Sequence, residues 1–583
     1  MLVTAVANDN ATKTGKAAGD NGAARIRRHV DRRIVALRSD RMSWFNHWRD
    51  LSAYLVPRRG RFLVTPNDGR RGSPLNQKVI DSTATLALRV LSSGLMSGMT
   101  SPARPWFQLT LGDRRLAEGS PVKLWLDEVT KRLLRVFAKS NAYNCLATVY
   151  EELGLFGTGV LLVEEDPRDI IRCRTLTAGE YFLANDEHTE VNTLYREFTR
   201  TVAQVVEQFG LDSSSPTVKS LYDSGSVDRE VIVCHAVEPN HEYVPNAFGA
   251  KGMPFRSVYW EWGTSQDMVL EVRGFHEFPA CCPRWHLISN DAYGRSPGMD
   301  ALGDVKALQI EQKRKAQAID KMVDPPMLGD ASLKNEQATL LPGGVTYVSG
   351  ASQIGFKPVY EVQPPLQGLV EDIQEVQGRI DKCFFTDLFL AISQLDTVRT
   401  AQEIIARKQE QMLQLGTVLE RLHKELLNPL VSRTFAIMAR GSLPYWRKGK
   451  DGLLPMPPRG LQGFDLDVEY VSVLADAQKA VATTGIERLF GFVGNIAAAR
   501  PDALDNIDFD EGIAEYADAL GVSSKLILAP GKVAAIRAQR AQQQQQQLAF
   551  QNSLAAAQGA QTLSNTDVGG GQNALQKMLG GAQ

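Results

Sequence analysis

Three acidic residues on one strand-like segment are the strongest candidates for metal chemistry in this sequence. Asp465, Asp467 and Glu469 alternate with apolar residues in FDLDVEYVSVL (464–474), so a strand would place their carboxylates on one face. Carboxylate oxygens in such a row could bind a divalent cation. The same alternation is typical of a strand that packs one face on a core and exposes the other to water, and this simpler interpretation is favoured.

One cysteine and a few histidines are the other residues whose types could support catalysis. Cys282 lies four residues before His286, which suggests a nucleophile and its base, but such pairs are usually assembled from segments distant in sequence. His235 and His241, followed by Glu242, lack the HExxH spacing of zinc proteases, and no third ligand stands out. The phosphate-binding patterns GxxxxGK(S/T) and GxGxxG are absent as well. The sequence therefore predicts a protein that is not an enzyme and uses no metal or cofactor.

The charge balance argues against a static clamp on nucleic acid. Lys plus Arg number 65 and Asp plus Glu number 66 in 583 residues. Proteins that hold nucleic acid tightly usually carry a basic excess, although near-neutrality still allows a surface past which DNA slides. Hydrophobic residues make up 43% of the chain and charged residues 22%, so most of it should fold into several globular domains.

The cysteines and the N-terminal segment favour synthesis in a reducing cytoplasm. The six cysteines are scattered without a CxxC pattern, so neither a zinc site nor a disulfide framework is predicted. Residues 1–24 lack the basic-then-apolar order of a signal peptide and are expected to form a flexible arm. The apolar stretch LGLFGTGVLLV (153–163) is too short to span a bilayer, so no membrane partner is expected.

Hydrophobic periodicity divides residues 25–295 into the helices and strands of one α/β body. Apolar residues recur at intervals of three or four over 25–55 and 120–155, which predicts amphipathic helices. A largely antiparallel sheet is predicted from the runs GVLLVEED, VNTLYREFTRT, REVIVCHAVEP and RSVYWEWGT. TVAQVVEQFG is predicted to be a short helix with Thr201 and Gln204 as a capping box.

Two helices then bracket a small β module, as expected for an antiparallel hairpin with a cap on its tip. The first covers residues 296–326, with Ser296 as N-cap and Pro297 at the first helical position. The second covers residues 366–385, and its apolar stripe consists of Leu366, Leu369, Ile373, Val376, Ile380 and Cys383. Between them, PGGVTYVSG and GFKPVYEV have the composition of short strands with Gly and Pro turns.

A third helix is predicted from Thr400 to Arg440, and its 41 residues would span about 60 Å. Its apolar stripe consists of Leu415, Leu419, Leu422, Leu426 and Leu430. Pro429 predicts a kink near Asn428, because proline lacks the N–H that the helix needs. Gly441 is expected to end the helix.

Two further segments have a distinctive composition. RVLSSGLMSGMTSPARPW (89–106) places its smallest residues on an apolar helix, which predicts close packing against another backbone. The Ala/Gln/Gly-rich tail (531–583) has too little apolar surface for a core, so it is predicted to be a solvated helix or disordered.

Four long blocks, taken together, are similar to a known family. They are WFNHWRDLSAYLVPRRGRF, DSTATLALRVLSSGLMSGMTSPARPWFQL, FPACCPRWHLISNDAYGRSPGMDALGDVKALQ and TAQEIIARKQEQMLQLGTVLERLHKELLNPLV. In this order and at this spacing, over roughly residues 40–530, the chain resembles the head-to-tail connector, or portal, proteins of short-tailed bacteriophages. The two ends of the chain lie outside the resemblance.

The resemblance implies an α+β portal fold with an α/β wing, a two-helix stem, a small α/β clip, a long channel helix and a mostly helical crown. The segments are the arm 1–24, wing 25–295, stem helix 296–324, clip 325–364, second stem helix 365–386, channel (tunnel) loop 387–399, long channel helix and return to the wing 400–462, crown 463–530 and tail 531–583.

The resemblance also implies a function and a set of partners. Such proteins form a ring, usually of twelve subunits, at one capsid vertex of the virion, after assembly in the host cytoplasm. Terminase pumps double-stranded DNA in through the channel, and the DNA later leaves through it. Major capsid and scaffold proteins surround the ring, and tail adaptor proteins dock on the clip.

Three groups of residues are predicted to serve this function. The stem cations that would line the DNA channel are Lys306, Lys313, Arg314 and Lys321, and helix periodicity lets only some of them face it. The channel constriction would be formed by Ser393, Gln394, Asp396 and Arg399. The clip contacts to terminase and tail would be Lys334, Glu336 and Lys357. Sparse basic rings suit a conduit, because each phosphate contact is multiplied around the ring and slows the DNA.

Two alternatives from other classes stay open at this point. A virion-associated DNA-processing enzyme, such as a nuclease, would need a cluster of acidic or metal-binding residues. A minor capsid or scaffolding protein without a pore is the other alternative. The stem-like helix pair argues against it, although only by analogy of architecture.

Overall fold

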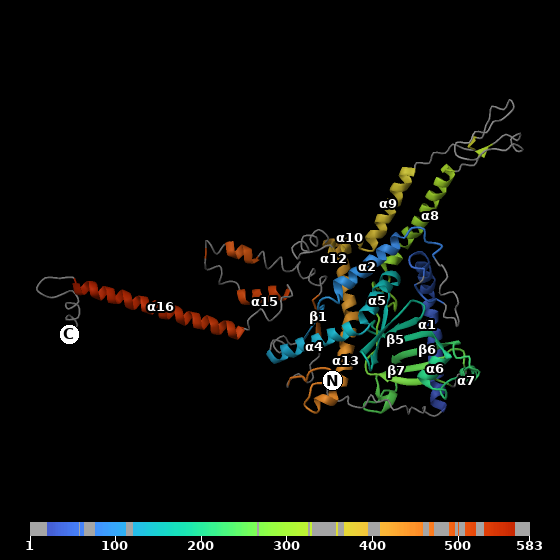
Figure 1. Cartoon of the computed structure of the whole chain (residues 1–583), viewed down its shortest axis with the longest axis horizontal. Helices are drawn as coiled ribbons and strands as arrows, with labels where there is room; N and C mark the ends of the chain where they lie inside the picture. Colours follow the sequence, from blue (N-terminus) through green and yellow to red (C-terminus); the bar gives the residue numbers. More distant parts are fainter. Residues whose placement is uncertain are drawn as a thin grey trace. The chain divides into compact units, whose positions relative to one another are not determined.

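The computed structural model divides the chain into two compact units, residues 1–478 and 479–583 (Figure 1). The structure describes residues 20–57, 59–62, 76–111, 120–264, 268–323, 327–328, 357–358, 366–393, 409–458, 466–471, 489–495, 500, 508–519 and 530–565. Among these residues, none of the helices combines the length and the apolar character that crossing a membrane requires.

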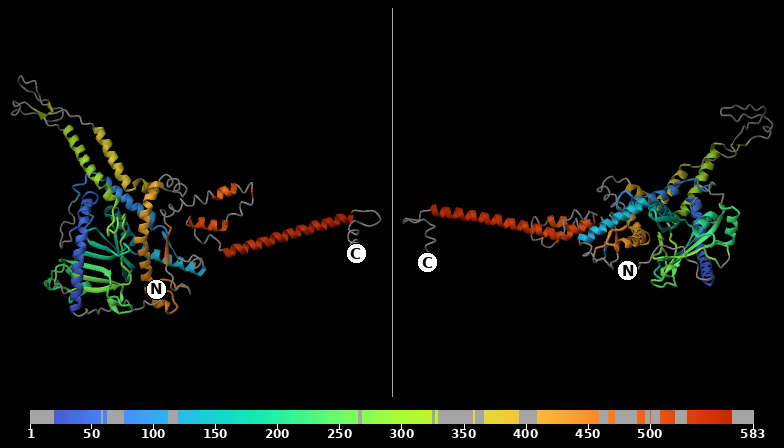
Figure 2. Two further views of the ribbon diagram at one scale, coloured as in Figure 1. Left: turned by 180° about the vertical axis from the view of Figure 1, so that it is seen from behind. Right: turned by 60° about the horizontal axis from the view of Figure 1, so that its bottom comes forward.

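A five-stranded antiparallel sheet in the order β4-β5-β6-β7-β8 contains three of the four predicted strands, whereas the fourth, GVLLVEED, lies in a separate sheet. The strands of the five-stranded sheet are β4 (Tyr181–Asn185), β5 (Val191–Thr201), β6 (Glu230–Pro239), β7 (Phe255–Glu261) and β8 (Glu271–Phe275). Alternate residues of β6 and β7, such as Cys234 and Trp260, pack against Val30 and Ile34 of α1 (Asp20–Tyr54). In the left view of Figure 2, α1 lies in front of these strands.

Two short helices cover part of the opposite face of the sheet. Val233 and Tyr259, which alternate with the residues facing α1, pack with apolar residues of α6 (Val202–Phe209) and α7 (Pro216–Asp223). Thr201 and Gln204 form both hydrogen bonds of the predicted capping box at the start of α6.

The largest core joins the helices α2 (Thr83–Met99), α4 (Ser120–Lys139) and α5 (Ala142–Phe156) to a three-stranded sheet. This sheet has the order β3-β2-β9, with β2 at Val160–Asp166, β3 at Ile170–Leu176 and β9 at Ala280–Cys281. Helix α5 ends at Gly157, whose φ of +76° favours glycine. A Cβ added there would lie 2.3 Å from the carbonyl oxygen of Gly294, so these two backbones approach too closely for any side chain.

The predicted hairpin is confirmed as α8 (Pro297–Val323) and α9 (Leu366–Cys383), which run side by side in Figure 1. The Ser296 hydroxyl accepts the Met299 N–H as predicted for an N-cap, and it donates to the Leu155 carbonyl, which fixes the root of α8 on α5. Buried residues of α9 follow its predicted stripe, with Ile373, Val376 and Ile380 in the core.

The cap between these helices is described only at one short ladder. Strand β10 (Met327–Leu328) pairs antiparallel with β11 (Lys357–Pro358). The second predicted strand of the module therefore pairs with residues directly after α8, whereas the first predicted strand, 342–350, lies outside the described residues.

The long helix continues beyond its predicted end. It consists of α12 (Gln409–Leu422), the π turn η3 (His423–Leu427) and α13 (Asn428–Trp446), and its predicted leucine stripe is buried. The start predicted at 400–408 lies outside the described residues. Gly441 does not end the helix; a Cβ there would lie 2.9 Å from Leu453 Cδ1, so the glycine makes room for the chain that packs back on the helix.

The segment predicted to be a loop from residue 387 begins as a helix, α10 (Thr386–Ser393). Its Leu388 and Phe389 are buried, and the Phe389 ring lies against Gly94 of α2. A Cβ on Gly94 would lie 2.2 Å from Phe389 Cδ1. The close packing predicted for the small residues of α2 is thus observed at this glycine, as a contact within the chain.

Two predicted boundaries of the first unit move in the structure. The crown was expected to begin at 463, but β12 (Leu466–Tyr470) pairs with β1 (Phe107–Leu111) and so belongs to the first unit, because Tyr470 is buried in the large core. The arm was expected to reach residue 24, but α1 begins at Asp20, and Ala23 and Ala24 are buried.

The second unit contains α15 (Phe509–Ala519) and α16 (Pro530–Asn565). The Gln-rich segment is the solvated helix of the two predicted alternatives, since the described side chains of α16 are almost all exposed. Arg537 of α16 forms an ion pair with Asp510 of α15 at 2.6 Å.

Replacing Gly94 with alanine should test the tight contact between α2 and α10. The added methyl group would overlap the Phe389 ring, so we expect Gly94→Ala to lower the free energy of unfolding by about 1–3 kcal/mol. Urea denaturation of the purified chain measures this change. Ser93→Ala, an equally small change on the exposed side of the same helix, is the control. Equal midpoints for both variants would contradict the observed packing.

Candidate functional site: the hairpin, the constriction segment and the jointed helix

The carboxylates considered for metal binding lie on an ordinary solvated strand face. Asp467 and Glu469 are exposed on β12, while Val468 and Tyr470 on the other face contact the core. Asp465 lies outside the described residues. Among the residues that the structure describes, no group of three His, Cys, Asp or Glu side chains could hold a metal ion.

The cysteine and histidine candidates have structural surroundings. Cys282 is buried, and burial raises the pKa of its thiol well above the usual value, which disfavours a reactive thiolate. His235 lies between Arg196 Nε at 3.0 Å and Ser257 Oγ at 2.9 Å. Burial, followed by the charge of Arg196, lowers the pKa of His235 well below its usual value, so it is a neutral core residue.

The four predicted stem cations fall into two groups. Lys306 donates to Asp50 of α1 at 2.7 Å and lies 5.3 Å from the Tyr54 ring, so this side chain holds α8 against α1. Lys313, Arg314 and Lys321 are exposed farther along α8. In the described part of the chain these three side chains form no ion pair or hydrogen bond, although the charge of Arg314 opposes the rise in the pKa of Glu311, three residues earlier.

The predicted constriction and clip residues lie mostly outside the described residues. Ser393 is the last residue of α10, whereas Gln394, Asp396 and Arg399 belong to the segment 394–408 that follows it. Lys357 is the first residue of β11, and its partner Leu328 lies just beyond α8. Lys334 and Glu336 lie outside the described residues. The roles of both groups stay predictions.

The long helix of α12, η3 and α13 contains a joint where the sequence predicts a kink. Pro429 has no N–H to donate to the Glu425 carbonyl four residues earlier, and its ring would collide with that carbonyl in a regular α-helix. The π turn from His423 to Leu427 widens the helix at this point, and the Asn428 N–H bonds to the His423 carbonyl five residues earlier. The proline therefore accounts for the joint.

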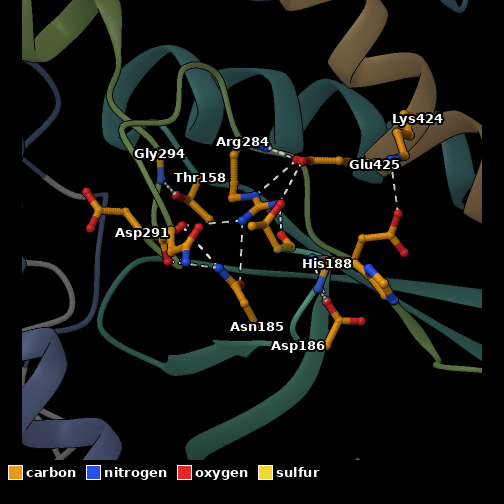
Figure 3. A network of polar contacts seen from close by, with 12 residues as sticks. Thr158, Asn185, Asp186, His188, Arg284, Asp291, Gly294, Lys424 and Glu425 are labelled. Atoms are coloured by element: carbon orange, nitrogen blue, oxygen red, sulfur yellow. Dashed lines mark hydrogen bonds and ion pairs between the residues drawn. The ribbon is translucent and has the colours of Figure 1, made fainter.

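A buried arginine holds this joint against the sheets (Figure 3). Arg284 is 2% exposed, and its side chain donates to both carboxylate oxygens of Glu425, at 2.7 Å from Nη2 and 3.2 Å from Nε. The Arg284 backbone N–H also donates to Glu425 at 2.9 Å. A two-point contact of this kind fixes direction as well as distance.

The remaining donors of Arg284 bind the turn between β4 and β5 and a nearby loop. Nη2 donates to the Thr189 carbonyl at 2.8 Å, and Nη1 lies 3.5 Å from Asn185 Oδ1 and 3.4 Å from the Asp291 carbonyl. Thr189 has a φ of +64°, an unfavourable conformation for a β-branched residue. The Thr189 carbonyl accepts a hydrogen bond from the buried Arg284, and this contact stabilises the turn in its unfavourable conformation.

The same π turn makes two further contacts with other elements of the first unit. Lys424 forms an exposed ion pair with Glu190 at 3.0 Å. The His423 ring stacks on Tyr470 of β12, with ring centroids 4.0 Å apart and planes 5° apart. Burial lowers the pKa of His423 to about 4, so the imidazole is neutral at physiological pH. The joint is thus attached both to the five-stranded sheet and to the β1–β12 pair.

Sequence reasoning identified Pro429 but missed Arg284 and Glu425. Arginine and glutamate are usually exposed, and these two residues lie 141 positions apart. One indication was present in the sequence: Glu425 is adjacent to Leu426 of the predicted apolar stripe, so partial burial of its side chain could have been expected. The partner of a half-buried carboxylate cannot be identified from one sequence.

Comparisons with known proteins place this architecture in a family. The bacteriophage head to tail connecting protein family matches residues 27–528. The chain is 44% identical over 538 residues to the portal protein of Salmonella phage epsilon15, covering 92% of this chain and 95% of that protein. It is 45% identical over 528 residues to the probable portal protein of Bordetella phage BPP-1, covering 90% and 92%. The chain belongs to the bacteriophage head to tail connecting protein family, which confirms the resemblance.

Solved structures give only a distant likeness. A chain from the neck of an empty gene transfer agent particle, computed with C6 symmetry, is 12% identical, with a TM-score of 0.29 over 75% of this chain and 92% of that one. A chain from the virion of a native gene transfer agent particle gives a TM-score of 0.26 over 70% and 94%. Scores this low do not establish a shared fold.

Removing Glu425 should show how strongly the joint depends on its buried ion pair. Glu425→Ala leaves the Arg284 charge buried without a counter-charge, so we expect the free energy of unfolding to fall by roughly 3–5 kcal/mol. Lys424→Ala, which removes the neighbouring exposed pair, should change it by less than about 1 kcal/mol. Urea denaturation distinguishes the two. Similar losses for both variants would show that Arg284 finds other acceptors.

The stacked histidine predicts a pH dependence of stability. The pKa of His423 is about 4 in the folded chain and 6.5 ordinarily, so the unfolded chain binds more protons between these values. Stability should therefore fall as the pH drops from 6.5 towards 4. His423→Phe keeps a ring against Tyr470 and should reduce this slope, as followed by urea midpoints at several pH values. An unchanged slope would assign the acid sensitivity to other groups.

Proposed function

We propose that this chain is a phage portal protein, which forms a ring at one capsid vertex and serves as the conduit for DNA packaging and ejection. The observation that carries the proposal is the identity of about 45% to two phage proteins named as portal or probable portal proteins, over at least 90% of this chain. The ring is also the docking platform for the tail.

The proposal assigns each segment of the chain to a part of the portal ring. The sheets with α1–α7 form the wing, α8 and α9 the stem, and residues 325–364 the clip. The constriction segment 387–399, which begins within α10, narrows the channel, and the long helix that contains α12 and α13 stands behind it. The second unit, from residue 479, supplies the crown and the tail helix. Terminase and then tail adaptors contact the clip through Lys334, Glu336 and Lys357, while capsid and scaffold proteins surround the wing.

The charge pattern supports a conduit. The whole chain has a formal net charge of −1, so a ring would not hold DNA through a large basic excess. Lys313, Arg314 and Lys321 are the proposed cations of the stem, while Lys306 is occupied by Asp50 within the chain. The joint at 423–427 links the constriction segment mechanically to the wing through the Arg284–Glu425 pair.

The first test is the mass of the assembled protein. Twelve copies of the 64.2-kDa chain have a mass of about 770 kDa, and portal proteins close into cyclic rings. Mass photometry of the purified chain should show a species near this mass, and negative-stain images should show a central hole. A monomer that persists across salts and pH values, together with magnesium-dependent cleavage of plasmid, would support a DNA-processing enzyme instead.

The second test addresses the constriction. Alanine at Ser393, Gln394, Asp396 and Arg399 should impair DNA packaging or retention while the rings stay intact, because these residues would act on passing DNA. Packaged DNA per particle and ring mass are measured on the same preparations. Loss of the ring in any of these variants would make that residue structural.

A further inference from the structure

The outer side of α9, opposite its buried stripe, carries a regular row of residues. Counting from Gly368, the spacings are three, four, three and four, so all five residues lie on one face of the helix. The row consists of Gly368, Glu371, Glu375, Gly378 and Lys382. None of its members is among the buried residues of the chain.

Helix α8 carries a matching row on its own outer side. Its spacings from Gly303 are four, three, four, three and four, and it lies on the side of α8 away from the buried Val305 and Leu308. The row consists of Gly303, Ala307, Ile310, Arg314, Gln317 and Lys321. Ile310 is 52% exposed in its centre. Rows with this heptad-like spacing are the ones along which helices pack side by side.

Three glycines in these rows have no close neighbour among the residues that the structure describes. A Cβ added to Gly303, Gly368 or Gly378 would meet nothing within 4 Å. Each helical glycine costs about 1 kcal/mol relative to alanine. By contrast, Gly94 and Gly298 have close neighbours in the chain that a side chain would displace or crowd. Glycines on an exposed helix face suit the close approach of another helix.

The charges of the two rows are complementary. The α9 row presents Glu371 and Glu375, and the α8 row presents Arg314 and Lys321. Glu375 accepts from Arg379 at 2.9 Å in the same helix, whereas Glu371 accepts only an amide hydrogen bond from Gln367 at 3.2 Å among the described residues. Glu371 is therefore the carboxylate best able to accept a cation from outside the chain.

Arg314 of α8 and Glu371 of α9 also lie at similar positions along the axis of the hairpin. Arg379 of α9 pairs with Asp304 of α8 at 3.2 Å. One to two turns farther out, burial and then the charge of Asp372 raise the pKa of Glu311, so these two residues are neighbours as well. Continuing this antiparallel register puts Arg314 within about one helical turn of Glu371 along the axis. Copies at equal height in a ring would bring these two residues together.

We propose that the outer row of α8 in one copy packs along the outer row of α9 in the next copy, with Arg314 against Glu371. The contact is heterologous and repeats around the ring, and the three glycines let the helices approach closely. This inference rests on the proposed ring. In this arrangement Arg314 and Lys321 face the neighbouring copy, so Lys313 is the one of these three cations that is left for the channel wall.

Charge reversal with rescue tests the pair. Arg314→Glu and Glu371→Arg should each raise the concentration for half-assembly, roughly three- to tenfold, because like charges then meet at every subunit boundary. The double variant should restore assembly, whereas a purely structural role for either residue would not. Asp320→Lys, an exposed reversal on α8 outside the row, should leave assembly unchanged. Mass photometry over a dilution series measures all four.

A substitution at a glycine gives an independent measurement. Gly378→Leu should raise the stability of the monomer through its higher helix propensity, yet it should lower the ring fraction by occupying the contact. A single chain that is both more stable and assembles less well would support a close helix contact.

The outcomes separate this inference from the proposed function. If the natural chain never forms a ring, the proposed function fails. If it forms rings and Arg314→Glu leaves them unchanged, the pairing is wrong. Reduced DNA packaging with intact rings in that variant would assign Arg314 to the channel wall instead.

Discussion

A charged group buried in this chain must be surrounded by acceptors, and the guanidinium group of Arg284 imposes that requirement on the first unit. Taking such a charge out of water costs several kcal/mol unless it is fully paired. Its acceptors come from the turn after β4, from the loop at 290–291 and from Glu425 in the long helix. Three segments distant in sequence are therefore fixed relative to one another by one side chain.

The contacts around Arg284 also help to fix the directions of the hairpin α8–α9 and of the long helix α12–α13. The hairpin begins at Ser296, close behind the loop that Arg284 organises, and its first turn is anchored to the Leu155 carbonyl. The jointed helix is held at Glu425 and then by Arg433, which donates to the Val163 carbonyl of β2 at 2.9 Å. A displacement of the π turn His423–Leu427 would therefore reach the sheets through paired charges rather than through a flexible connection.

Much of the fold could be predicted from the sequence because amphipathic spacing reports burial directly. The leucine stripe of the long helix, the stripe of α9 and the caps at Thr201 and Ser296 are local patterns with local causes. The structures of Gly441 and of residues 387–393 were predicted wrongly because tertiary partners decide them: Leu453 lies 12 residues from Gly441, and Gly94 lies hundreds of residues from Phe389. The candidate site was less predictable than the fold, since a buried arginine and an exposed one look alike in sequence.

The ladder between β1 and β12 has a consequence for how the chain is made. Phe107 pairs with Tyr470, so this sheet closes a loop of more than 350 residues, and contacts of such sequence separation form late and slowly. During synthesis the hairpin of α8 and α9 can form earlier, because its contacts join residues that are closer in sequence. The first unit stays open along β1 until the ribosome has delivered residue 470. Until then Trp106 and Phe107 lack their partner strand, which makes that edge the natural place for a chaperone to bind a nascent chain.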